Sequence, residues 1–151
     1  HRFYSTLCAE SSGVWINQVN HAKEASILDI MAPANQKLSW LSEGELNYYV
    51  NFFKEGGLRG PINWYRAIPL NGLETMELRD KKISQPAAFI SGAKDDVLKY
   101  GGLNNEWVDA MDAWFSDLKF KTLIEDAGHW LQCEKPEETT REILKFLEMV
   151  S

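Results

Sequence analysis

The chain has 151 residues, of which 44% are hydrophobic and 25% are charged, a balance typical of a folded domain rather than a disordered segment. Its net charge of −6 and the lack of a basic cluster argue against a nucleic-acid partner. No stretch approaches the roughly 20 apolar residues that span a membrane, and Cys8 and Cys133 form neither a metal pair nor a disulfide framework. We therefore predict a protein of the reducing cytoplasm, with no metal and no cofactor.

Helices are predicted for most of residues 1–70. In residues 1–40, apolar side chains recur at loosely helical spacing, which indicates short helices joined by polar turns. A stronger helix is expected after Ser42, because Ser42 and Glu45 match a capping box. Pro61 then stands where the first turn of a further short helix is expected.

The pattern changes in the second half of the chain. Residues 71–85 are predicted to be a connector, because they combine turn residues with a charged run that belongs in solvent. Residues 86–91 and 120–124 are short apolar runs, which predict two buried strands. Between them, an amphipathic helix is marked by Trp107, Met111, Trp114 and Leu118.

A last helix is predicted to begin at Pro136, with Ile143, Phe146, Leu147 and Val150 facing a core. The acidic run from Glu134 to Glu142 is interpreted as the solvated face and first turn of this helix, not as a metal site. The resulting strand–helix–strand–helix order predicts an α/β fold with parallel strands and crossover helices. Two parallel strands make too small a sheet, so the rest of the sheet is expected before His1.

Two polar residues follow the predicted strands at the places where parallel strands end. Asp95 follows the first strand and His129 follows the second, and a carboxylate beside a histidine forms two thirds of a charge-relay constellation. From position alone the acid is left open among Asp95, Asp96 and, less plausibly, Asp126 or Asp109. Cys133 is expected to be buried and unreactive, and is not predicted to be a thiol nucleophile.

Three segments resemble the C-terminal half of α/β-hydrolases of the epoxide hydrolase type. Residues 60–66 (GPINWYR) are similar to the tyrosine motif of the family's cap, and residues 92–97 (GAKDDV) to its acid loop. Residues 128–132 (GHWLQ), followed by residues 134–138 (EKPEE), are similar to its histidine loop and final helix. A Gly-His pair is common to many α/β-hydrolases, but its combination with Asn-Trp-Tyr-Arg upstream is much narrower. The resemblance covers roughly residues 42–151.

The resemblance implies an architecture. Residues 1–70 would form a helical cap, residues 71–85 a connector, and residues 86–151 the C-terminal part of the α/β-hydrolase core. The fold class is therefore predicted to be the C-terminal part of an α/β-hydrolase fold, a helical cap followed by two parallel strands with crossover helices.

The resemblance also implies roles for five residues. His129 would be the base that activates water, Asp95 the acid that orients it, since the family's acid motif has the form Asp-x-Val, and Tyr65 a donor to the epoxide oxygen. In isolation Tyr65 would more often be a core aromatic, and only the family motif favours the functional role. Trp64 and Trp130 are placed in substrate binding, because large aromatic surfaces often line apolar pockets, although Trp130 also fits a packing role.

One part of the family's mechanism has no counterpart in the chain. The family's aspartate nucleophile lies in a small-x-Asp-x-Gly segment, which residues 1–151 do not contain. A second cap tyrosine is also unassigned, with Tyr4, Tyr48 and Tyr49 available. Because the chain begins with His1, we expect a processed product, a cleaved fragment or part of a longer protein.

The predicted function is hydrolysis of a hydrophobic epoxide to a vicinal diol through an aspartyl ester. An N-terminal half of the same protein would be the partner that supplies the nucleophile. A haloalkane or haloacid dehalogenase, or an ester hydrolase, is the alternative on the same scaffold. An inactive fragment that binds apolar ligands is the alternative that is not an enzyme.

Overall fold

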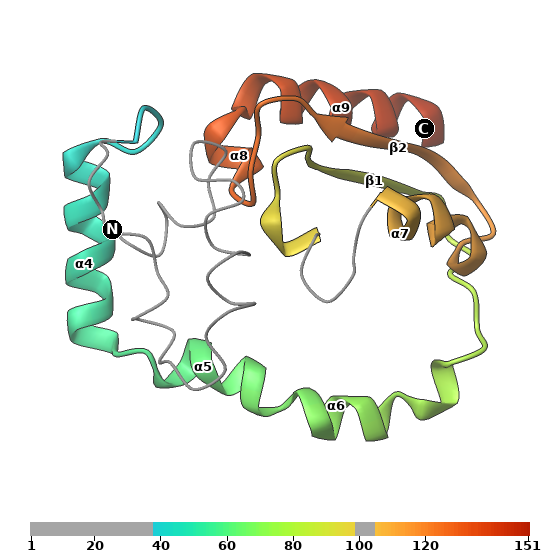
Figure 1. Ribbon diagram of the computed structural model, residues 1–151, viewed down its shortest axis with the longest axis horizontal. Coiled ribbons are helices and arrows are strands. Elements are labelled where there is room, and N and C mark those ends of the chain that lie inside the picture. Colours follow the sequence, from blue (N-terminus) through green and yellow to red (C-terminus); the bar gives the residue numbers. More distant parts are fainter. Residues whose placement is uncertain (1–37, 99–104) are drawn as a thin grey trace. The chain divides into compact units, whose positions relative to one another are not determined.

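The structure is a computed structural model that describes residues 38–98 and 105–151. The described residues fall into two compact units: residues 41–82 form the first unit, and residues 38–40, 83–98 and 105–151 form the second (Figure 1). The short helices expected in residues 1–37 lie outside the described residues. The predicted division into cap, connector and core stays a prediction.

The first unit begins with helix α4 (Glu43–Gly56), and the predicted capping box is present. The backbone N–H of Glu45 donates to Oγ of Ser42 at 3.3 Å, and the backbone N–H of Ser42 donates to Oε2 of Glu45 at 2.9 Å. The helix ends at Gly57, whose φ of 68° suits glycine and whose N–H donates to the carbonyl of Phe53 at 2.9 Å. These local hydrogen bonds explain why the helix could be located from the sequence.

Two further helices follow, α5 (Arg59–Arg66) and α6 (Ile68–Glu74), and then a 3₁₀ turn η2 (Met76–Leu78). Pro61 lies in the first turn of α5, as expected, since its missing N–H costs nothing there. Much of the predicted connector is therefore helical, because Asn71 and Gly72 continue α6 instead of forming a turn. Helices α4, α5 and α6 have no buried residue, so local hydrogen bonds rather than burial define them.

The second unit contains two parallel strands, β1 (Ala87–Gly92) and β2 (Leu118–Ile124). Between them lie helix α7 (Asn105–Ala110) and the 3₁₀ turn η4 (Met111–Trp114). The helix expected to reach Leu118 ends earlier, because Leu118 is already the first residue of β2 and pairs with Ala87. The α/β order of the prediction is confirmed.

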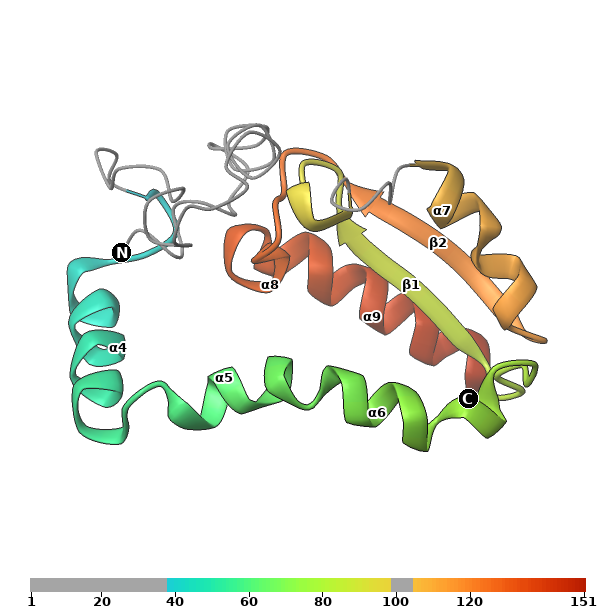
Figure 2. The ribbon, with the colours of Figure 1, turned by 60° about the horizontal axis from the view of Figure 1, so that its bottom comes forward.

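Helices α8 (Leu131–Glu134) and α9 (Pro136–Val150) follow β2. Helix α9 lies along one side of the two strands and α7 on the other (Figure 2). Cys133 is exposed, contrary to expectation, and Leu131 is the buried residue of the four-residue helix α8. None of the helices in the described ranges is long and apolar enough to cross a membrane.

The apolar face of α9 is only partly covered. Phe146 is half-buried, but Ile143, Leu147 and Val150, which were expected to face a core, are 46%, 48% and 38% exposed. That expectation was wrong for these three residues in this chain, because two strands offer α9 only a narrow surface. The small buried cluster of Ile124, Ala127 and Leu131, with Ile90 against it, lies instead at the carboxyl end of the strands.

Candidate active site

The loops that follow β1 and β2 are held together by their backbones. The N–H of Ala93 donates to the carbonyl of Ile124 at 2.9 Å, and the N–H of Lys94 donates to the carbonyl of Ala127 at 2.9 Å. The carboxyl ends of parallel strands are where α/β folds place their sites, because the loops meet at one edge. Residues 34 positions apart in the chain are thereby brought side by side.

Gly92 makes this close approach possible. A β-carbon at this buried position would overlap the backbone carbonyl oxygens of Ala127 and Gly128. These are main-chain atoms that cannot rotate away as a side chain would. Only glycine therefore lets β1 end directly against the loop that carries His129.

His129 and Asp95 form a hydrogen-bonded pair. Nδ1 of His129 lies 3.0 Å from Oδ2 and 3.2 Å from Oδ1 of Asp95. Asp95 is 6% exposed, and its Oδ1 also accepts the backbone N–H of Val97 at 2.9 Å. Since an ionised carboxylate only accepts hydrogen bonds, it favours the proton on Nδ1 and leaves the lone pair of Nε2 for a base. This is the arrangement that orients a histidine for proton transfer from water.

The same contact changes the acidity of the imidazole. The pKa of His129 is raised above 6.5, chiefly by its hydrogen bond to Asp95 and secondarily by the charges of Asp95 and Glu134, while partial burial opposes the rise. A base with a raised pKa binds the proton of water more strongly, provided that the imidazole is neutral when the water arrives.

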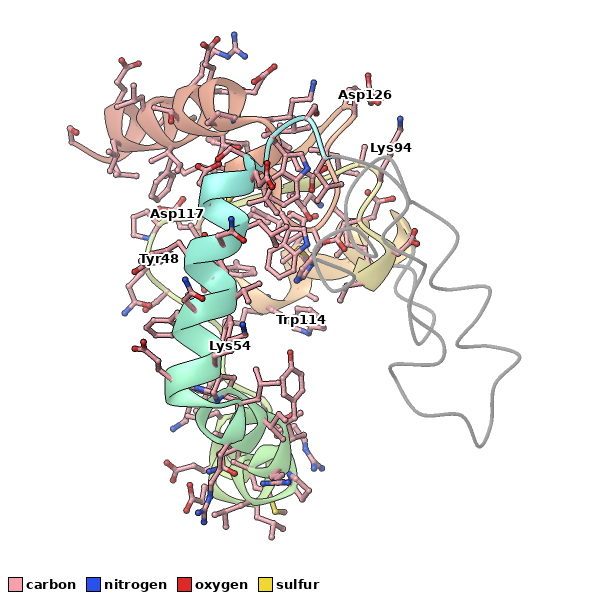
Figure 3. The ribbon with its side chains drawn as sticks, turned by 90° about the vertical axis from the view of Figure 1, so that its left-hand side faces the viewer. Tyr48, Lys54, Lys94, Trp114, Asp117 and Asp126 are labelled. Atoms are coloured by element: carbon pink, nitrogen blue, oxygen red, sulfur yellow. The ribbon has the colours of Figure 1, made fainter. Side chains whose placement is uncertain are left out.

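The other candidate acids occupy different places. Asp126 has a φ of 55° and pairs with Nζ of Lys94 at 2.6 Å, and both side chains project from adjacent loops (Figure 3). The hydrogen bond and charge of Lys94 lower the pKa of Asp126. Asp109 is exposed on α7, and Asp96 is 1% exposed beside Asp95. Asp95 is thus the acid whose oxygens lie within hydrogen-bond distance of Nδ1.

The sequence interpretation missed Glu134. Its Oε2 accepts the backbone N–H of Gly128 at 3.0 Å, and its Oε1 accepts the backbone N–H of Trp130 at 3.0 Å. The residue assigned to a solvated helix face therefore binds the main chain on both sides of His129. No capping-box pattern marks this role in the sequence, because Glu134 lies four residues, and not three, after Trp130, the residue that precedes α8.

The predicted tryptophans and tyrosines are distributed over both units. Trp130 packs edge-on against the imidazole of His129, with ring centroids 5.1 Å apart. Trp64 and Tyr65 lie on α5 in the other unit, where they are 77% and 71% exposed. The structure therefore joins His129, Asp95 and Trp130, and leaves the roles of Trp64 and Tyr65 as predictions.

The remaining tyrosines add little to the choice of a second donor. Tyr48 is 67% exposed on α4 and Tyr49 is half-buried beside it, whereas Tyr4 lies outside the described residues.

Across residues 38–98 and 105–151, no three His, Cys, Asp or Glu side chains are grouped so that they could hold a metal ion.

The chain is similar in sequence to several epoxide hydrolases. It is 34% identical over 147 residues to bifunctional epoxide hydrolase 2 of Rattus norvegicus, an alignment that covers 97% of this chain and 26% of the rat protein. It is 38% identical over 109 residues to epoxide hydrolase A of Mycobacterium tuberculosis, covering 72% of this chain and 32% of that protein. No protein-family model matches the chain.

Solved structures give the same result for the fold. An epoxide hydrolase from an endophytic Streptomyces superposes with a TM-score of 0.84 at 26% identity, covering 98% of this chain and 44% of that one. Potato (Solanum tuberosum) epoxide hydrolase I superposes with a TM-score of 0.75 at 26% identity, covering 98% and 48%. The chain thus spans about a quarter to a half of the length of these relatives.

The parallel strands and these superpositions define the fold as the C-terminal part of an α/β-hydrolase. Within that class, the sequence similarity is to enzymes that open epoxides. The chain corresponds to the C-terminal part of an α/β-hydrolase-fold epoxide hydrolase.

Proposed function

We propose that the complete protein hydrolyses an epoxide to a vicinal diol, and that this chain supplies the base His129 and its orienting acid Asp95. The observation that carries the proposal is the contact of 3.0 Å between Nδ1 of His129 and the buried carboxylate of Asp95. That contact prepares Nε2 to accept a proton from water, which is the chemistry that hydrolysis of an ester intermediate needs.

The proposed reaction has two steps. A nucleophilic aspartate attacks one epoxide carbon, the carbon–oxygen bond of the ring breaks, and an ester and an alkoxide form. Tyr65 donates a hydrogen bond to the developing alkoxide, which then takes up a proton from the solvent. In the second step Nε2 of His129 removes a proton from water, the hydroxide attacks the ester carbonyl, and the diol leaves with the carboxylate restored. The imidazolium then returns its proton to the solvent, which balances the proton taken up in the first step.

The nucleophile is assigned to an N-terminal half of the same protein, because residues 1–151 contain no small-x-Asp-x-Gly segment. "Complete enzyme" below means this chain joined to, or in complex with, that half. The substrate is proposed to be a small hydrophobic epoxide, bound in part by Trp64 and Trp130, whose rings offer large apolar surfaces. The scarcity of cysteines supports a cytoplasmic location.

The direct test replaces the base. In the complete enzyme, His129→Ala should still form the ester but hydrolyse it very slowly, so that the protein gains the mass of one epoxide. Intact-mass spectrometry after mixing with a styrene-type epoxide measures this gain, and chromatography measures the diol. Diol formation at the rate of the unchanged enzyme would refute the assignment of His129.

A dehalogenase or ester hydrolase on the same scaffold is the second candidate. Its support is that the pair of His129 and Asp95 suits hydrolysis of any ester intermediate, whereas the donor that distinguishes an epoxide lies on α5. In the complete enzyme, Tyr65→Phe should slow ester formation from the epoxide by about 10²- to 10³-fold, the usual cost of losing one donor to an oxyanion. Unchanged epoxide turnover in this variant would favour the second candidate.

An inactive ligand-binding fragment is the remaining alternative, and its support is the missing nucleophile. Intact-mass analysis of native material distinguishes it. A co-purifying N-terminal polypeptide, or a longer chain, supports the enzyme, and this chain by itself supports the fragment.

A further inference from the structure

We propose that Glu134 is a positioning residue, which fixes the main chain on both sides of His129 so that the imidazole is held for ester hydrolysis. The kinetic part of this proposal rests on the proposed function. The contacts that carry it are the two hydrogen bonds of 3.0 Å from the backbone N–H groups of Gly128 and Trp130 to the two oxygens of one carboxylate.

The two hydrogen bonds from Gly128 and Trp130 to Glu134 are called the clamp below. Each oxygen of Glu134 accepts one N–H, and the two donors flank His129 in the sequence. The backbone N–H of Glu134 in turn donates to the carbonyl of Trp130 at 2.9 Å, which closes the single turn of α8. Hydrogen bonds to an ionised acceptor are stronger than those between neutral groups, so the clamp restrains the loop more than two ordinary turn contacts would.

Helix α9 is hydrogen-bonded to the turn that carries Glu134. Oγ1 of the buried Thr139 donates to the carbonyls of Leu131 at 3.2 Å and Lys135 at 2.7 Å. These two acceptors lie on either side of Glu134 in the chain. The carboxylate therefore lies on a turn that is hydrogen-bonded to the 15-residue helix α9.

His129 is consequently held at two points. Asp95, from the loop after β1, holds the ring at Nδ1, while Glu134, from α8, holds the backbone that carries the ring. Asp95 and Glu134 are also the charged groups that raise the pKa of His129, and Lys94 is engaged with Asp126 instead. A clamp on the base affects the step in which the base takes a proton, and it leaves ester formation to other residues.

The test uses Glu134→Gln in the complete enzyme. A glutamine has nearly the same shape, but only one of its two terminal atoms can accept a hydrogen bond, so one N–H loses its partner. Because a misplacement of about 1 Å can cost about 10²-fold in rate, we expect ester hydrolysis to slow by roughly 10- to 100-fold. The rate of ester formation should be unchanged, and the pKa of His129 should fall because a nearby negative charge is removed.

Two further variants separate position from charge and from folding. Glu134→Asp keeps the charge but is too short to reach both N–H groups, so ester hydrolysis should slow while the pKa of His129 stays raised. Glu137→Gln is the matched control, because Glu137 is exposed in the first turn of α9, three residues further on. It should leave both rates and the pKa unchanged.

Rapid-quench mass spectrometry measures the two rates, and NMR titration of the imidazole carbons measures the pKa. Wild-type ester hydrolysis in Glu134→Gln would overturn the proposal, and so would an equal loss in Glu137→Gln. If the unchanged enzyme forms no ester from an epoxide, the proposed function fails instead. Hydrogen exchange of the Gly128 and Trp130 amides then decides the clamp: faster exchange in Glu134→Gln supports it, and unchanged exchange refutes it.

Discussion

The two units of the chain obtain their order in different ways. In residues 83–151, hydrogen bonds join residues far apart in the sequence, such as Asp95 and His129, which are 34 positions apart. In residues 41–82, the hydrogen bonds that define the helices are local, as between Ser42 and Glu45, three positions apart. No residue of α4, α5 or α6 is buried, whereas Asp95 is 6% exposed.

The difference shows which of the proposed site residues are held in place by contacts within this chain. The acid and the base are fixed by contacts within one unit, including the close approach at Gly92. Tyr65 and Trp64, by contrast, lie exposed on α5, a helix with no buried residue. Changes in residues 83–151 should therefore act on the site, and changes in residues 41–82 on local helix stability.

The largest effect is expected at the orienting acid. In the complete enzyme, Asp95→Asn should lower ester hydrolysis by about 10³- to 10⁴-fold, because an amide can present its NH₂ group to Nδ1 and stabilise the wrong tautomer of His129. Single-turnover kinetics measure the loss, and NMR of the imidazole nitrogens reports the tautomer. Asp96→Asn is the matched control and should leave ester hydrolysis unchanged. If Asp96→Asn lowered the rate as much as Asp95→Asn, and the tautomer of His129 were unchanged in Asp95→Asn, Asp96 would be the better candidate for the orienting acid.

The pH dependence tests the same pair. Neutral His129 is needed for ester hydrolysis and its pKa is raised, so the rate should fall with decreasing pH through a midpoint above 6.5. For stability the sign is opposite: the contribution of the charged pair is full below the unfolded value of 6.5 and is lost as pH rises through the raised pKa. Because the imidazole is 36% exposed, solvent screens this contribution. In Asp95→Asn the midpoint of the pH–rate profile should move to lower pH. An unchanged midpoint would contradict the assignment of the raised pKa of His129 to Asp95.

A moderate effect is expected at the junction of the two site loops. Gly92→Ala should lower the free energy of unfolding by about 1–3 kcal/mol, the usual cost of overpacking, and should displace the loop of His129. Gly44→Ala in α4 is the matched control, because beyond its chain neighbours and the backbone of its own helix no atom lies within 4 Å of its added methyl group. That control should be neutral or stabilising by up to about 1 kcal/mol. Denaturant titrations compare the two variants, and equal effects would mean that the crowding at Gly92 is relieved by small shifts.

The smallest effect is expected at the capping box. Ser42→Ala removes the acceptor for the N–H of Glu45 and should cost about 1 kcal/mol, confined to α4. Hydrogen exchange should show faster opening of the first turn of α4, with unchanged exchange in β1 and β2. Ser42→Asp should restore protection, since aspartate is also a good cap. Loss of protection in the strands would reveal coupling that the local contacts do not predict.

Features with local causes could be predicted from the sequence. The capping box, the strand order and the placement of Asp95 and His129 after parallel strands follow from short patterns. The identity of the orienting acid came from the family motif, and the geometry fits it.

What could not be predicted depends on the surroundings of each residue. The carboxylate of Glu134, on the single turn of α8, accepts the backbone N–H of Gly128. The pattern of charges in the sequence does not reveal this contact. The apolar residues of α9 were expected in a core, but periodicity gives the direction of a helix face and not the extent of the surface that covers it. The helix through Asn71 and Gly72 likewise overrides a strong turn signal.

The parallel pairing of β1 with β2 also bears on how the site arises during folding. A parallel pair closes only after the whole crossover has been gathered in, and the entropy of that loop is lost before any strand contact compensates for it. The hydrogen bond between Asp95 and His129 spans 34 residues and therefore forms together with the sheet, while α4 can form from neighbouring residues alone. We therefore expect the acid–base pair to form together with the sheet, so that its imidazole signal would report on the closure of the two strands.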